Sequence, residues 1–215
     1  MQSVLALYQC TRRHPVIQCV LQQTPVLQWR PLLHTAAKHT CICIPDPLPW
    51  LRELGCDTSA AITPTGCDVT VRFQAQVLRT FAPVQVYAQT LLAVKLVQAD
   101  PRVVALNFVA PEDHRIALRD YRQHMRFIAE LSAEFPSQPA GITLHAGELT
   151  MGLVPPEDLG WHIREAIETA GATRIGHGID IAYDDNMDAL LNSMAEQDVM
   201  VEINLTSNDV ILGIK

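Results

Sequence analysis

The chain has 215 residues, of which 48% are hydrophobic and 18% are charged, and its formal net charge is −7. This composition is typical of a folded globular protein and excludes an intrinsically disordered one. The acidic charge argues against binding to nucleic acid, which normally requires a basic face. No apolar run reaches the ~20 residues of a transmembrane helix, and the N-terminus lacks the pattern of a secretory signal. We therefore expect a cytoplasmic protein that binds neither nucleic acid nor a membrane.

Residues 1–66 differ from the rest of the chain in proline content and periodicity, and they form an unassigned segment. They contain seven of the 14 prolines, and neither helical nor strand periodicity persists in them. Short strands are expected at 16–21 and 41–44. The pair Cys41 and Cys43 has a spacing that could belong to a zinc site, but the sequence holds no second pair. We therefore expect reduced thiols there.

From residue 67 to 215, strand and helix patterns alternate, which predicts one partial domain. The expected strands are 68–78, 102–109, 141–145, 173–177 and 199–205, and the expected helices are 83–99, 113–135, 155–170 and 184–197. The later strands are continuous apolar runs, which are typical of parallel strands buried on both faces. A doubly wound nucleotide-binding sheet is disfavoured because no glycine-rich phosphate loop follows a strand. The sequence therefore predicts an α/β fold, a (β/α)8 barrel of which about five βα units are present.

Polar side chains gather just beyond the C-terminal ends of these strands, where barrel enzymes carry their catalytic groups. They are Asn107, Glu112, His145, Glu148, His177, Asp180, Asn204, Ser207 and Asn208. A neutral imidazole binds zinc well, so His145 can be a metal ligand. Glu148 can pass protons without being a ligand, and His177 can be a base, an oxyanion partner or the residue that orients the attacking water. A glycine beside them, Gly147, lets a substrate approach the backbone closely.

Three strings carry a resemblance to a known family. TLHAGE at 143–148, RIGHG at 174–178 and EINLTSN at 202–208 resemble the adenosine deaminase family of metal-dependent amidohydrolases. The longer string HAGELTMGLVPPEDL is similar to bacterial adenosine-deaminase-like proteins, and the resemblance runs from about residue 68 to the last residue. It implies a mononuclear zinc site on a (β/α)8 barrel that hydrolyses the 6-amino group of adenosine or a related purine nucleoside.

The resemblance also implies roles for single residues. His145 would be a zinc ligand, and Glu148 would donate a proton to the purine ring nitrogen. His177 would orient the water that zinc binds and take its proton. The backbone at Ala110, where the family has a glycine, and at Gly147 would contact the purine substrate. Asn208 is expected to be structural and to brace the end of its strand.

The other zinc ligands of the family are not recognisable in the sequence. It contains no HxH pair, since His34 and His39 are too far apart to serve as one, and it ends at Lys215 without the aspartates of the eighth strand. A catalytic zinc ordinarily takes three protein ligands, so we expect zinc binding by this chain to be weak or absent. The alternative to an enzyme is therefore a catalytically inactive fragment or a degenerate homologue that only binds.

Two further expectations follow from the incomplete barrel pattern. A binuclear hydrolase with a carboxylated lysine is disfavoured because the strand at 102–109 contains no lysine. A barrel that is not closed has open strand edges, which are exposed to aggregation unless they are covered. We expect residues 1–66 or a second copy of the chain, in a homo-oligomer, to cover them.

Overall fold

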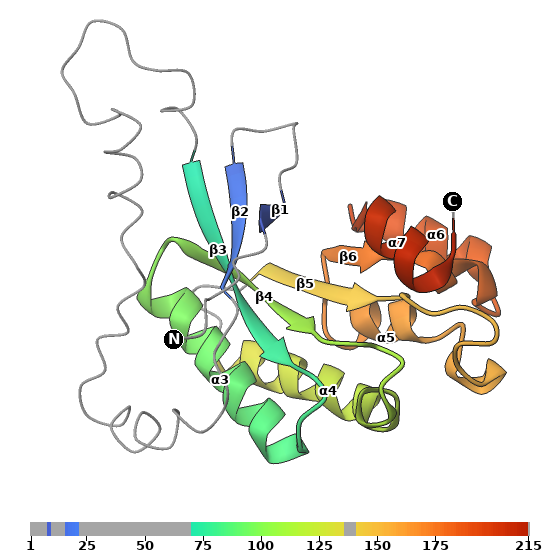
Figure 1. Cartoon of the computed structure of the whole chain (residues 1–215). Coiled ribbons are helices and arrows are strands. Elements are labelled where there is room, and N and C mark those ends of the chain that lie inside the picture. The colour runs from blue at the N-terminus through green and yellow to red at the C-terminus, as the bar shows by residue number, and fades with distance from the viewer. Residues whose placement is uncertain (1–7, 10–15, 22–69, 136–140, 215) are drawn as a thin grey trace, which may run out of the picture. The chain divides into compact units, whose positions relative to one another are not determined.

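The structure, a computed structural model of the whole chain, describes residues 8–9, 16–21, 70–135 and 141–214 (Figure 1). The chain divides into two compact units, Met1–Gln74 and Ala75–Lys215, and each is described by itself. In the first unit β1 (Tyr8–Gln9) pairs in antiparallel fashion with β2 (Val16–Leu21), so the strand predicted at 16–21 is present. The strand predicted at 41–44, the cysteine pair and the histidines at 34 and 39 lie outside the described residues.

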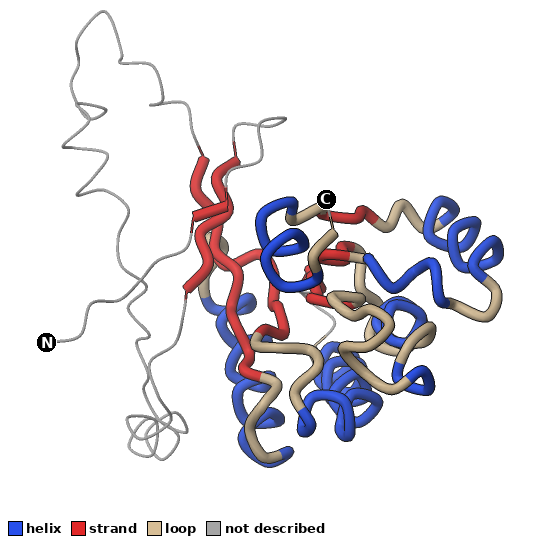
Figure 2. Tube along the Cα trace, turned by 45° about the vertical axis from the view of Figure 1, so that its right-hand side comes forward, coloured by secondary structure: helices blue, strands red, loops and turns tan. Residues whose placement is uncertain are grey.

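From residue 70 onward, five parallel strands alternate with helices. The strands are β3 (Thr70–Leu78), β4 (Val103–Val109), β5 (Gly141–Ala146), β6 (Arg174–His177) and β7 (Met200–Glu202). They lie in the sheet in chain order, and each of the last three pairs in parallel with the strand before it. Figure 2 shows strand, loop and helix following one another along this part of the chain. This is the arrangement that the sequence predicts for part of a (β/α)8 barrel.

The helices lie between the strands in sequence and pack against one another. They are α3 (Pro83–Ala99), α4 (Arg115–Glu134), α5 (His162–Glu168), α6 (Met187–Glu196) and α7 (Leu205–Leu212), with 3₁₀ turns η2 (Pro156–Asp158) and η3 (Ile179–Tyr183). Figure 1 shows α3, α4 and α5 along one side of the strands. Helix α4 contacts both α3 and α5, so these three helices form a continuous layer.

Local sequence sets the ends of the two long helices. Helix α3 begins at Pro83, whose missing N–H costs nothing in a first turn, and it stops at Asp100, directly before a proline. Helix α4 begins after His114, whose Nδ1 accepts a hydrogen bond from the N–H of Ile116 at 3.2 Å. Its buried apolar residues recur at helical spacing. They are Ala117, Tyr121, Met125, Ile128 and Leu131.

Two expected elements differ from the structure. The helix predicted at 155–170 is a 3₁₀ turn followed by the shorter helix α5, because Gly160 between them has φ of +82°, which no helical residue adopts. The strand predicted at 199–205 ends at Glu202 in the structure. Leu205, the last residue of the predicted strand, instead begins helix α7. Gly213, in the left-handed conformation, ends α7 as glycine commonly does after a helix.

The strands provide the centre of the hydrophobic core, and α7 contributes least to it. Leu144 of β5 lies in register with Phe108 of β4 and Ile175 of β6, and all three are at most 1% exposed. In contrast, Leu205 and Val210 of α7 are 76% and 77% exposed. Among the described residues, no helix is long and apolar enough to cross a membrane.

The central position of Leu144 gives a test of this packing. The Leu144→Ala substitution should lower the free energy of unfolding by about 2–5 kcal/mol, because it leaves a cavity between two neighbouring buried strands. The matched control is Leu205→Ala at an exposed position, which should change stability by no more than ~0.5 kcal/mol. Urea denaturation followed by circular dichroism measures both. Equal effects of the two substitutions would contradict the placement of Leu144 in the core.

Candidate active site

The ends of β5 and β6 place the three predicted functional residues at one edge of the sheet. His145 is the last residue but one of β5, Glu148 follows two residues after this strand, and His177 ends β6. The register pairs Ala146 with His177. Because neighbouring parallel strands finish at the same edge, side chains beyond these ends are brought together.

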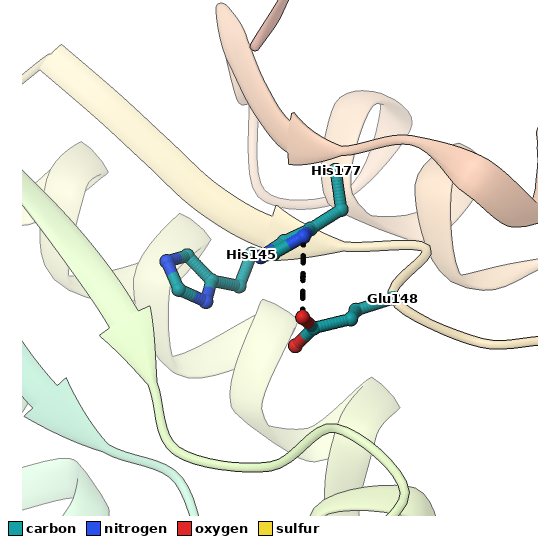
Figure 3. Close-up of side chains that lie close together, drawn as sticks. All are labelled: His145, Glu148 and His177. Carbon is teal, nitrogen blue, oxygen red and sulfur yellow. Dashed lines mark ion pairs between the residues drawn. The ribbon is translucent and has the colours of Figure 1, made fainter. Parts of the chain in front are cut away.

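The three side chains are in fact clustered. The imidazole rings of His145 and His177 have their centroids 4.9 Å apart, and His177 Nδ1 lies 3.3 Å from Glu148 Oε1. Figure 3 shows the carboxylate of Glu148 directed toward the ring of His177, with His145 beside them. One possible ligand atom from each of the three lies within 4.8 Å of the others. The sequence prediction that they meet at one rim is thereby confirmed.

Residues of α7 orient two members of the cluster. Asn208 Oδ1 lies 2.9 Å from His177 Nδ1, and Ser207 Oγ donates a hydrogen bond to Glu148 Oε1 at 2.7 Å. With two oxygens near it, Nδ1 of His177 is the nitrogen that carries the proton in the neutral ring, and Nε2 keeps its lone pair. This Nε2 is buried and has no hydrogen-bond partner among the described residues. Asn208 thus contacts His177 from helix α7, whereas the sequence predicts that it braces the end of its own strand.

His145 is held by its backbone and kept neutral by its surroundings. Its N–H donates to Asn107 Oδ1 at 3.3 Å, and its carbonyl accepts a hydrogen bond from Arg79 Nη2 at 2.6 Å. Burial lowers the pKa of His145 to about 3, and the electrostatic interactions with Arg79 and His177 act in the same direction. At neutral pH the ring is therefore uncharged, which is the form that binds a metal ion.

The two predicted substrate-contacting positions have unusual backbone conformations. Ala110 follows β4 with φ of +81°, a left-handed conformation that favours glycine, so the glycine that the family has there would suit this backbone. Gly147 has φ of +80°, and a Cβ at this position would lie 2.4 Å from Asp180 Oδ1. A side chain is thus excluded at 147, whereas whether either backbone contacts a purine stays a prediction.

Two residues of the site were not singled out in the sequence. Arg79 follows β3 and is 1% exposed, and its Nη2 also donates to the carbonyl of Phe108 at 2.7 Å. His162, at the start of α5, is fully buried with its Nδ1 2.7 Å from Glu112 Oε1. An arginine directly after a strand is a weak signal in the sequence, and nothing in the spacing links position 162 to position 112.

The donor set fits a zinc ion. Two imidazoles and one carboxylate are common zinc ligands, and three protein ligands are what a catalytic zinc ordinarily has. The buried lone pair of His177 Nε2, which no described residue satisfies, is the kind of atom that a metal ion would complete. Within the described residues, His145, Glu148 and His177 are the one group of three metal-binding side chains.

Parallel βα units with histidine and glutamate just beyond the C-terminal ends of their strands define an α/β fold consistent with part of a (β/α)8 barrel. The sequence model of the adenosine deaminase family matches residues 54–214. The chain belongs to the adenosine deaminase family. No curated protein matches it.

Asp180, whose carboxyl group lies beside Gly147, predicts how the stability of the protein depends on pH. Burial raises the pKa of Asp180 to about 8, and the negative charges of Glu112 and Asp184 add to this. Its carboxyl is therefore protonated in the folded protein at neutral pH but ionised in the unfolded chain, where its pKa is near the usual ~3.9. Folding takes up a proton, so the stability that Asp180 contributes is complete below pH ~4 and is lost as the pH rises toward 8.

The Asp180→Asn substitution removes this titration. The melting temperature of the variant relative to the parent should rise between pH ~4 and pH 8 and then stay level. Differential scanning calorimetry at intervals across this range measures the difference. A difference that is constant over the whole range would show that Asp180 is ionised in the folded protein.

Proposed function

We propose that this chain carries part of the active site of a zinc-dependent hydrolase that deaminates adenosine or a related purine nucleoside. The observation that carries the proposal is the clustering of His145, Glu148 and His177 at one edge of the sheet. Membership of the adenosine deaminase family supplies the reaction: water replaces the 6-amino group of the purine, and ammonia leaves.

Each residue of the cluster has the chemistry that this reaction needs. His145, with its neutral ring, is the residue that would hold the zinc ion. When bound, the ion supplies a Lewis acid that makes water more acidic. Glu148 donates a proton to the purine ring nitrogen, which makes C6 more electrophilic, and the hydroxyl of Ser207 fixes its carboxyl group. His177 offers the lone pair of Nε2 to the proton of the attacking water.

A second candidate function has its own support. The HxH pair of the family is not recognisable in the sequence, while Glu148 and His177 lie close enough to His145 to bind one ion together with it. In that case the three residues form a metal-binding site, and the protein is a binding-only homologue without deaminase activity. The two candidates differ in the role of Glu148, which is a proton donor in the first and a metal ligand in the second.

Substitutions at 145 and 148 distinguish the two functions. In a protein that holds the complete site, if His145 is a ligand and Glu148 a proton donor, His145→Ala should lose zinc, whereas Glu148→Gln should keep zinc and lose ~10²–10⁴-fold in turnover. Zinc content and the loss of adenosine absorbance measure the two effects. The matched control is Glu196→Gln at an exposed position, which should alter neither.

The outcomes separate clearly. We expect the chain by itself to bind zinc weakly, because only His145 matches a zinc ligand of the family. Loss of zinc in Glu148→Gln, with no turnover in the unsubstituted protein that holds the complete site, would favour the binding-only function. Near-normal turnover of Glu148→Gln would remove the carboxylate from the mechanism.

A further inference from the structure

Glu112 is a fully buried carboxylate that touches the functional segment without belonging to the cluster. It lies in the loop after β4 and is 2% exposed. Its Oε1 accepts a hydrogen bond from the N–H of Gly147 at 3.1 Å, and its Oε2 accepts one from the N–H of Glu148 at 2.9 Å. Successive backbone N–H groups can form a concave site that binds an anion. Here the carboxylate of Glu112 occupies the site formed by the amides of Gly147 and Glu148.

A buried histidine contacts this carboxylate from the other side. His162 Nδ1 lies 2.7 Å from Glu112 Oε1, and the ring of Tyr121 stacks on His162 with centroids 3.9 Å apart. The hydroxyl of Tyr121 also donates to the carbonyl of His162 at 3.1 Å. Burial raises the pKa of Glu112, but the hydrogen bond and charge of His162, the charge of Arg79 and the amide of Glu148 outweigh it and lower this pKa to about 2. Glu112 is therefore ionised at any ordinary pH.

The same segment is held at its other end by the opposite charge. Arg79 binds the carbonyl of His145, and Glu112 binds the amides of Gly147 and Glu148. The carbonyl oxygen of His145 carries a partial negative charge and faces the cation Arg79. The amide hydrogens of Gly147 and Glu148 carry partial positive charges and face the anion Glu112. Charge-assisted hydrogen bonds of this kind are stronger than neutral ones, so the peptide plane before Glu148 is fixed.

We propose that Glu112 is a positioning residue: by holding the Gly147 and Glu148 amides, its carboxylate directs the side chain of Glu148 toward Ser207 and His177. The proposal rests on the proposed function only in giving Glu148 a chemical role. Within the described part of the chain, Glu112 makes hydrogen bonds to the backbone amides of Gly147 and Glu148 and to the ring of His162. It acts through the backbone, and it explains why a loop residue carries a buried charge at this rim.

The Glu112→Gln substitution tests this role, because it keeps the shape but presents an N–H group to one of the two amides. Asp184→Asn is the matched control: Asp184 is also buried and ion-paired, to Arg164 at 2.6 Å, but it contacts neither amide. In Glu112→Gln, hydrogen exchange at Gly147 or Glu148 should accelerate by ~10-fold or more relative to the control, after correction for global stability. The 13C signal of the Glu148 side-chain carboxyl, at fixed pH, should move in Glu112→Gln and not in Asp184→Asn.

These two signals separate positioning from support of the fold. Faster amide exchange with an unmoved Glu148 carboxyl signal would show that Glu112 only anchors the backbone, and the proposal would fail. If Glu112→Gln does not fold, Glu112→Asp keeps the charge but is too short to reach both amides, and the same signals decide. In the parent protein, scalar couplings across the hydrogen bonds between the Glu112 carboxyl carbon and the two amide nitrogens are expected, and their absence would overturn the proposal.

A kinetic measurement links the proposal to the reaction. Where the parent preparation deaminates adenosine, Glu112→Gln should lower kcat by ~10-fold or more with KM nearly unchanged, since it displaces a proton donor and not a binding surface. A rise in KM with kcat unchanged would contradict positioning of Glu148. If the unsubstituted protein shows no turnover, the amide and carboxyl signals decide the proposal by themselves, because they do not depend on activity.

Discussion

The parallel register of β4, β5 and β6 is the constraint on which the site depends. It aligns Ala146 of β5 with His177 of β6, and it thereby brings two histidines from distant parts of the chain to one edge. A slip of one residue in either strand would turn every side chain of that strand to the opposite face. The apolar residues within the strands oppose such a slip, because it would move Leu144 and Ile175, which are fully buried, away from the neighbours against which they pack. Packing of the core therefore fixes the geometry of the polar rim.

The buried charged groups at this rim each face backbone groups of opposite partial charge. The guanidinium of Arg79 lies on backbone carbonyls, the carboxylate of Glu112 on backbone amides, and His162 beside that carboxylate. Beside these groups burial disfavours the charged forms, so His145 stays neutral and Asp180 stays protonated. Burial thus keeps the ring of His145 neutral and free to bind a metal ion.

The sequence predicts the strands, the long helices and the cluster well, because these depend on local patterns. Apolar runs locate β4, β5 and β6, and polar residues after these runs must meet if the strands are parallel. The contact between Glu112 and His162 could not be predicted in this way, since the two residues are 50 positions apart and nothing in their spacing signals a contact. Helix α7 was also missed, because EINL continues an apolar strand pattern up to the residue at which the helix begins.

The backbone at His177 has a consequence for how this site is dissected by mutagenesis. His177 has φ of +76°, a conformation in which a residue with a Cβ and no local hydrogen bond is strained by roughly 1–2 kcal/mol. Histidine and asparagine tolerate this conformation better than alanine does. An alanine scan would therefore add a backbone penalty to the loss of the imidazole and overstate the contribution of the ring. Asparagine at 177, compared with alanine, separates the chemistry of the side chain from the geometry that the chain imposes on it.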